Sequence, residues 1–306
     1  MSLAGVAVEP AERRRRDILG ALLLAFAWVF FTAEMMGVRL LSPDLAAPQI
    51  AFVRTATQAV LMGGLAIFLG RKMVATRRIR VHGLRALSSS VGMVLFYFAF
   101  ALLPVAVATT ITFTQASFLT VFAAVFLGEV IGWRRIGAVV LGFIGVLVVM
   151  RPGVGSFEPN MLIALAGAAV SAALLVITRS LSLTDHRWTI MFYSAWLGSL
   201  MLAIPAALLW QPVAREHLLL LAIVSLSGVL GQFLMVGAFR LAEASTLAPV
   251  DYVRLVFAVF AGYVLFSEIP DGWTIAGSAI ILLSAATIAA RRPATLTPPE
   301  PMGTPR

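Results

Sequence analysis

The sequence predicts an all-α membrane protein with ten transmembrane helices in two inverted five-helix repeats. Three observations predict this class: an apolar composition, ten separate apolar runs and an internal repeat. Hydrophobic residues make up 60% of the 306 residues and charged residues 12%, and the mean hydropathy is +0.97. Soluble domains have about 45–50% apolar and about 25% charged residues. Most of this chain is therefore expected to lie in lipid.

Ten apolar runs are long enough to cross a bilayer, which takes about 20 residues of α-helix. The runs are continuously apolar and do not alternate with a period of two, so a β-barrel is excluded. The first run is longer than the apolar region of a signal peptide, and we interpret it as a retained helix. The predicted spans are residues 18–41, 47–70, 84–103, 105–127, 133–150, 159–181, 187–210, 217–239, 245–266 and 272–290.

The two ends of the chain are polar. Residues 1–17 form a basic N-terminus, and the Pro-rich tail 291–306 is expected to be disordered. Lysine and arginine gather in alternate connections, including the loop 71–85, whereas the intervening connections hold few. Basic loops face the cytoplasm, so both termini are predicted to be cytoplasmic and the protein to lie in the cytoplasmic (inner) membrane.

The chain repeats itself weakly when it is shifted by about 140 residues. "FLGEVIGW" in the first half meets "LFSEIPDGW" in the second, and the two Ser-x-x-x-Gly pairs of spans 3 and 8 coincide. The halves are residues 18–152 and 153–290. Each half has five spans, an odd number, so the second half enters the membrane from the opposite side. Inverted repeats recur in secondary transporters, which bind their solute near the midplane between the repeats.

Several classes of function find no support. The chain has no cysteine, and its three histidines lack the spacing of metal ligands. No P-loop motif and no nucleophile–base set occurs, so we expect no catalytic residues, no metal, no cofactor and no enzyme activity. The net charge of +9 resides in the connections between spans, which argues against nucleic acid. The expected partners are a small-molecule solute and the lipid bilayer, with the chain a monomer or homodimer.

Four charged residues stand out away from the ends of the predicted spans: Glu34, Arg54, Asp251 and Arg254. A charge at the centre of a membrane helix costs about 2.5–3.5 kcal/mol, so it usually faces the interior and has a partner. We interpret Glu34, Arg54 and Asp251 as candidate coupling or gating charges. Asp251 and Arg254 lie three residues apart on one helix face. They form either a self-neutralising pair or a cavity-facing pair in which Arg254 holds a solute carboxylate.

The repeat bears on these alternatives. Shifted by 139 residues, Asp251 and Arg254 fall on Thr112 and Gln115, so both halves place polar groups at equivalent positions. An intrahelical pair would not explain polarity in span 4. This coincidence favours an interior location for all four residues, and it makes Thr112 and Gln115 candidate solute contacts.

Aromatic residues well inside the spans supply further candidates. Trp28, Tyr97 and Tyr252 are predicted to line the cavity, whereas tryptophans at span ends fit an interfacial belt. Pro249 lies inside span 9, removes a backbone donor there, and is a candidate hinge.

Four segments resemble the drug/metabolite transporter superfamily, EamA type: "LLAFAWVFF", "AFVRTATQAVLM", "LGEVIGWRRIGAVVLGFIGVLVV" and "FSEIPDGWTIAGSAIILLSA". The resemblance covers residues 18–290. It implies an alternating-access secondary transporter with a cavity between spans 1, 3, 4, 6, 8 and 9. It favours an exporter of amino acids, aromatic and neutral ones included. Uptake of a nucleoside-like or S-adenosylmethionine-like metabolite is the alternative, followed by a channel.

Overall fold

The computed structural model describes residues 10–127, 132–151, 158–182, 184–242, 247, 250 and 252–289. These residues contain every predicted span in whole or in part. Asp251, Pro249 and the predicted disordered tail lie outside the described residues.

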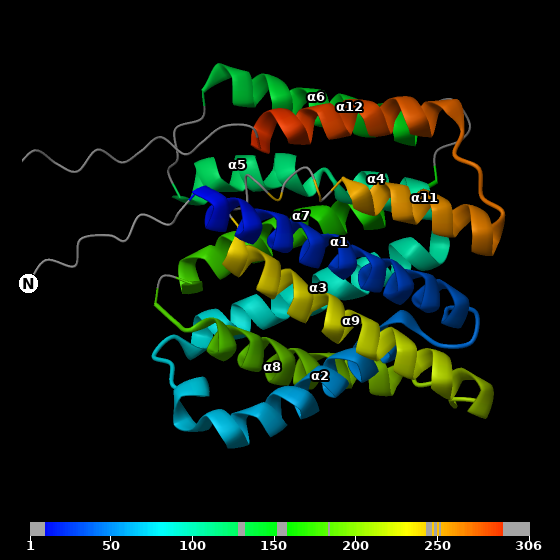
Figure 1. The fold of residues 1–306 in the computed structure, drawn as a ribbon. Helices are drawn as coiled ribbons and strands as arrows, with labels where there is room; N and C mark the ends of the chain where they lie inside the picture. The colour runs from blue at the N-terminus through cyan, green and yellow to red at the C-terminus, as the bar shows by residue number, and fades with distance from the viewer. Residues whose placement is uncertain are drawn as a thin grey trace, which may run out of the picture.

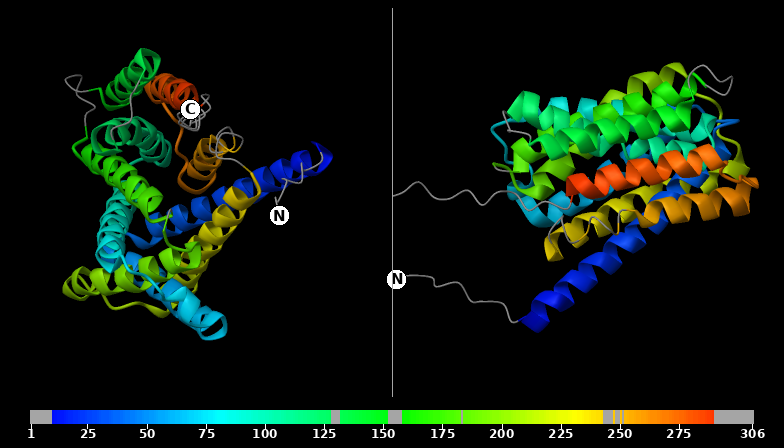
Figure 2. Two further views of the ribbon diagram at one scale, coloured as in Figure 1. Left: turned by 90° about the vertical axis from the view of Figure 1, so that its left-hand side faces the viewer. Right: turned by 90° about the horizontal axis from the view of Figure 1, so that it is seen from above.

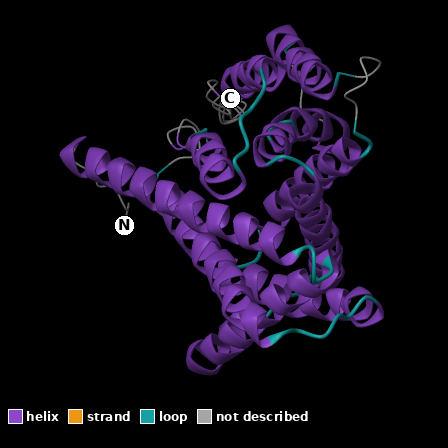
Figure 3. Cartoon of the chain, turned by 90° about the vertical axis from the view of Figure 1, so that its right-hand side faces the viewer, coloured by secondary structure: helices purple, strands orange, loops and turns teal. Residues whose placement is uncertain are grey.

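The described residues form a bundle of helices joined by short connections, without a strand among them (Figures 1 and 3). The first half contains α1 (Pro10–Leu41), α2 (Ala47–Leu69), the short 3-10 helix η1 (Gly70–Met73), α3 (Ile79–Leu102), α4 (Val105–Thr112), α5 (Gln115–Leu127) and α6 (Trp133–Met150). The second half contains α7 (Asn160–Ser182), α8 (Arg187–Leu208), α9 (Arg215–Leu241), α11 (Val253–Phe266) and α12 (Gly272–Ala289).

The helices have the length and polarity of membrane spans. Seven apolar segments are long enough to cross a bilayer, and three shorter apolar helices accompany them in the described part of the chain. Large apolar side chains are exposed on the outside of the bundle, such as Phe68 (88% exposed) and Ile67 (82%). Water would not tolerate so much exposed apolar surface, but lipid does. The chain is a multi-pass membrane protein.

Span 4 differs from the prediction, because it is two helices instead of one. α4 ends at Thr112 and α5 begins at Gln115. The hydroxyl of Thr112 donates to the carbonyl of Thr109 (2.6 Å), and that of Thr114 donates to Ile111 (2.7 Å). Such bonds offer the backbone carbonyls an alternative to the regular helical ladder and favour a break here. The helix α11 begins at Val253, one residue before Arg254, which is the repeat equivalent of Gln115.

The packing of the helices follows the inverted repeat. α1 packs along α9, and α3 packs along α7. These two contacts are equivalent, because α7 is the repeat mate of α1 and α9 is the repeat mate of α3. Two further contacts join a helix to its own repeat mate, α2 with α8 and α6 with α12 (Figure 1). A third joins the two equivalent spans 4 and 9, where α4 packs against α11. At the last contact the rings of Phe113 and Tyr252, which are 139 residues apart, lie 5.9 Å apart. Figure 2 shows that the N-terminal part of α1 extends away from the remaining helices.

Small residues permit the two equivalent packings. A Cβ atom on Gly92 of α3 would lie 3.3 Å from Ser171 Oγ of α7. Its repeat mate Gly231 on α9 would place a Cβ atom 3.1 Å from the ring of Phe31 on α1. The Ser-x-x-x-Gly pairs predicted from sequence therefore mark close helix contacts in both halves.

Polar contacts join the halves at both ends of the bundle. At the end where α1 finishes, Arg39 pairs with Glu268 (2.5 Å), and Glu268 accepts a hydrogen bond from the Val105 backbone N–H (2.8 Å). At the opposite end, Asp185 accepts from Thr76 (2.5 Å) and contacts the buried His82 ring (2.7 Å). Glu268 therefore has structural partners in the first half.

Candidate solute-binding cavity

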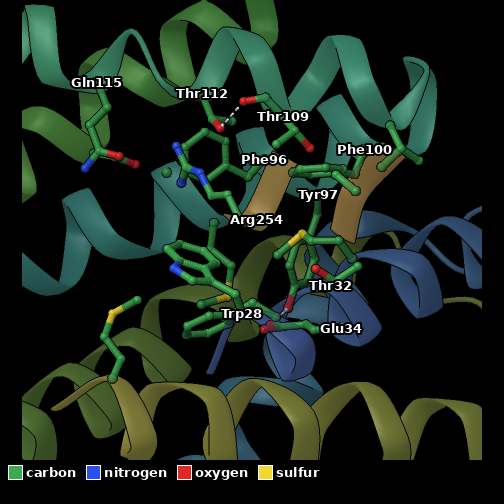
Figure 4. A pocket seen from close by; sticks show the side chains of 18 of the residues that line it. Trp28, Thr32, Glu34, Phe96, Tyr97, Phe100, Thr109, Thr112, Gln115 and Arg254 are labelled. Atoms are coloured by element: carbon green, nitrogen blue, oxygen red, sulfur yellow. Dashed lines mark hydrogen bonds between the residues drawn. The ribbon is translucent and has the colours of Figure 1, made fainter. Parts of the chain in front are cut away.

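A cavity of about 360 Å³ lies between the two halves. Side chains from α1, α2, α3, α4, α5, α7, α9 and α11 line it. These helices include parts of every span that the sequence analysis expected to line a cavity. They also include span 2, which contributes Arg54. Seven of the predicted site residues line this one cavity: Trp28, Glu34, Arg54, Tyr97, Thr112, Gln115 and Arg254. Figure 4 labels all of them except Arg54.

One side of the cavity is formed by a buried polar network. Arg54 Nε lies 3.2 Å from Glu34 Oε1, and the Tyr97 hydroxyl donates to the same oxygen at 2.6 Å. Glu34, Arg54 and Tyr97 are 2%, 5% and 1% exposed. Each comes from a different helix of the first half. A buried ion pair must be well hydrogen-bonded to offset the cost of desolvation, and here both charges are.

The remaining donors of Arg54 are also bonded. Nη1 donates to Gln58 Oε1 at 2.7 Å, and Nη2 donates to the Gly228 carbonyl at 3.1 Å and to Gln232 Oε1 at 3.3 Å. Gly228 and Gln232 lie on α9, so Arg54 connects the two halves of the molecule. The candidate charge is therefore paired across helices, as predicted for an intramembrane arginine.

Arg254 faces the cavity from α11. Its guanidinium carbon lies 3.7 Å from the centroid of the Phe113 ring and 5.0 Å from that of Trp28. Figure 4 shows Arg254 in the space between Trp28 and the helix that carries Thr112. A cation between two aromatic faces is held in place by the rings, which attract it electrostatically.

The polar residues of the broken span take different roles. The Thr112 hydroxyl donates to the Thr109 carbonyl, so its oxygen is left as an acceptor toward the cavity. Gln115 opens α5 and lines the cavity, and its amide makes no hydrogen bond to a described residue.

Tyr252 was also predicted to line the cavity, but it is not among the lining residues. Its ring packs against Phe113 and the apolar cluster around it. The reason is the inverted axis, which brings Tyr252 against its own repeat mate instead of toward the solute space.

Sequence reasoning missed four polar residues near Arg54. Gln58 lies one helical turn after Arg54, and this spacing could have indicated it. Gly228 and Gln232 come from the other half, and nothing in their local sequence indicates that they bond Arg54. Arg85 lies inside the predicted span 84–103 but was counted with the basic loop 71–85; in the structure it lies on α3, which begins at Ile79.

Comparison with known proteins places the chain among solute transporters. An "S-adenosylmethionine uptake transporter" of Rickettsia bellii is 32% identical over 76% of this chain and 80% of its own length. A "Pseudopaline exporter CntI" of Pseudomonas aeruginosa is 31% identical over 87% and 94%. A "Riboflavin transporter" of Vibrio cholerae is 29% identical over 87% and 89%.

The fold also has a solved counterpart. A crystal structure that is 16% identical superimposes with a TM-score of 0.56 over 90% of this chain and 96% of its own, which shows the fold alone. The EamA-like transporter family matches residues 17–151 and, a second time, residues 159–290. Since these two matches cover most of the sequence, the chain belongs to the EamA-like transporter family of the drug/metabolite transporter superfamily.

Proposed function

We propose that this protein is an alternating-access carrier for a metabolite in which an amino acid is joined to an aromatic ring system, with S-adenosylmethionine the first candidate. The observation that carries the proposal is the pairing of aromatic walls with separated charges in one cavity. Trp28 and Phe96 offer ring faces, while Glu34 and Arg254 place opposite charges in the same lining. A ring can stack while charged groups of the solute meet side chains of opposite sign.

The size of the cavity favours a solute larger than a free amino acid. Pockets that enclose drug-sized ligands measure about 300–1,000 Å³, and this cavity measures about 360 Å³. Relatives described as S-adenosylmethionine uptake transporters and as riboflavin transporters support a ring-bearing solute. Uptake thus becomes the first candidate direction, ahead of the amino-acid export that the sequence analysis favoured.

Export of a smaller amino-acid-like metabolite is the second candidate. A relative described as an exporter supports this direction of transport. It is 31% identical to this chain over 94% of its own length. Both directions use the same mechanism, because a carrier without a P-loop moves its solute along existing gradients.

Alternating access requires that one end of the cavity closes while the other opens. Val105 lines the cavity and donates its backbone N–H to Glu268, which in turn pairs with Arg39. These contacts join the halves where α1 finishes, as the Asp185 contacts do at the opposite end, but here they include a residue of the cavity lining, so we assign the closed end to this side. The basic loops predict that both termini are cytoplasmic. In that orientation the end of the bundle where α1 finishes faces the outside of the inner membrane.

Counterflow in proteoliposomes tests the function. Vesicles loaded with unlabelled S-adenosylmethionine should accumulate the labelled compound transiently, several-fold above unloaded vesicles, because a carrier returns faster when it is loaded. Trp28→Ala should abolish the accumulation. Trp133→Ala is the matched control, because Trp133 is 77% exposed on the outside of α6.

The alternatives predict other results. A channel would equilibrate the label without counterflow. Counterflow with free amino acids but not with S-adenosylmethionine would replace the first candidate with the second. Absence of counterflow with any of these solutes would contradict both.

A further inference from the structure

A second, smaller cavity of about 130 Å³ adjoins the first. The two share Arg54, Ser89, Met93 and Leu174 in their walls, so the smaller one is a side chamber of the larger. Its walls come from α2, α3, α7, α8 and α9. Its character differs from that of the main cavity, because arginine, glutamine and hydroxyl side chains dominate the lining.

The side chamber lies where the two repeats meet. Arg54 and Ser194 are repeat mates 140 residues apart, and both line it. Gln58 and Gly198 form a second such pair. Equivalent faces of α2 and α8 thus oppose each other, but of these two helices only α2 contributes large polar side chains to the lining.

The lining offers hydrogen-bond donors and lacks an acidic residue among its described members. Gln58 and Gln232 turn their carbonyl oxygens to Arg54, which leaves their amide N–H groups as the remaining donors. The Arg54 charge is balanced by Glu34.

Arg85 is the group in this lining whose charge is not balanced. Its Nε donates to Thr178 Oγ1 at 2.9 Å. Its Nη1 atom is buried and has no hydrogen-bond partner among the described residues. No described carboxylate pairs with it either. A buried guanidinium donor without an acceptor is costly, and an anion supplies both the acceptor and the opposite charge.

We infer that the side chamber is a carboxylate subsite: the solute places its ring in the main cavity and its carboxylate against Arg85. Arg254 is then not the carboxylate site, and its guanidinium lies over the rings of Phe113 and Trp28. The inference rests on the proposed function, and it narrows the substrate class to solutes with a carboxylate at one end. The volume of the chamber suits such a group with a few waters, whereas an aromatic ring system requires the main cavity.

The test compares two solutes that differ only in this group, S-adenosylmethionine and its decarboxylated analogue. In Arg85→Gln the Kd for S-adenosylmethionine should rise about ten- to a hundredfold, since hydrogen bonds to charged groups are among the stronger ones. The Kd for the analogue should stay within about twofold of the wild-type value, because the analogue has no carboxylate to bind Arg85. Arg85→Lys should fall between, because it keeps the charge but loses the planar fork. Arg80→Gln is the matched control, because Arg80 is an exposed arginine of α3.

Equal weakening of both solutes in Arg85→Gln would overturn the inference. So would an effect of Arg85→Gln that appears only when chloride is present, because the anion would then be an inorganic ion. L-Tryptophan and tryptamine form a second matched pair for the case of a smaller solute.

If neither pair binds to the wild type, the proposed function fails and the chamber is tested by itself. The chain lacks cysteine, so Ser194→Cys places a single thiol in the chamber. Acetate should slow its modification by a small thiol reagent severalfold, and should have no effect when Arg85→Gln is added. If acetate leaves the modification rate of Ser194→Cys unchanged while Arg85 is present, the carboxylate subsite is overturned.

Discussion

Gly228 is the residue on which the buried ion pair depends most directly. A Cβ atom there would lie 2.6 Å from both Arg54 Nε and Glu34 Oε1. Gly228→Ala must therefore displace one charge from the other, and we expect it to lower the free energy of unfolding by about 1–3 kcal/mol, as overpacking does. Transport should fall at least tenfold. Reversible unfolding in mixed micelles and counterflow measure the two effects.

Gly237→Ala is the control for this prediction, because it adds the same methyl group to the same helix. Its Cβ atom would meet Leu23 at an ordinary 3.6 Å. If Gly228→Ala matches Gly237→Ala in both measurements, the ion pair is not essential to the site.

At this scale the sequence identified charges better than their partners. Glu34 and Arg54 stood out because a charge in an apolar run is rare, whatever its surroundings. Gly228 and Gln232 are ordinary in their own segment and gain meaning only when α9 meets α2. The contact of Tyr252 with Phe113 could not be predicted for the same reason, since it is a tertiary one.

Among the elements, α12 shows how a span end is fixed outside the membrane. Asp271 precedes the helix, and its carboxylate accepts a hydrogen bond from the Thr274 backbone N–H at 2.8 Å, as an N-cap does. Arg151 pairs with the same carboxylate, but Asp271 is 44% exposed, so this ion pair adds little. Asp271→Ala should lower the free energy of unfolding by about 0.5–2 kcal/mol, and Asp271→Asn by much less because asparagine also caps.

The cap should be sensitive to acid. Hydrogen bonds from the Thr274 side chain and backbone, and then the nearby Arg151 charge, hold the pKa of Asp271 below its ordinary value of 3.8. Since this pKa is lower in the folded protein, the stabilisation is complete above pH 3.8 and is lost as the pH falls through the folded pKa. The difference between wild type and Asp271→Ala, measured by unfolding in micelles, should therefore shrink below that pH. A constant difference down to pH 2.5 would contradict the cap.

Element positions were predictable where apolar length decides, and less so where backbone chemistry does. The spans follow from hydropathy. The break between α4 and α5 depends on threonine hydroxyls at Thr112 and Thr114 that bond their own backbone, which composition alone does not resolve. The early start of α3 has a similar origin, because basic residues were taken as loop although they continue the helix.

At the scale of the whole molecule, the inverted repeat accounts for the arrangement of the cavities. Helices that meet their own mates lie on the pseudo-twofold axis, and the main cavity and its side chamber lie beside these contacts. The sequence predicted the repeat from a weak internal match. It could not predict the side chamber, because Arg54 and Ser194, which both line it from equivalent positions, are different residue types and give no internal sequence match.

The orientation of the bundle is the last property to test, and the absence of cysteine makes the test direct. Ala75 and Ala214 are exposed alanines in connections at opposite ends of the bundle, the first before α3 and the second before α9. Basic residues surround Ala75, so the positive-inside rule places it in the cytoplasm. In intact cells, Ala214→Cys should react with a membrane-impermeant maleimide and Ala75→Cys should not. Permeabilised cells should label both equally. The reverse pattern would invert the predicted topology, and it would turn the Arg39–Glu268 closure toward the cytoplasm.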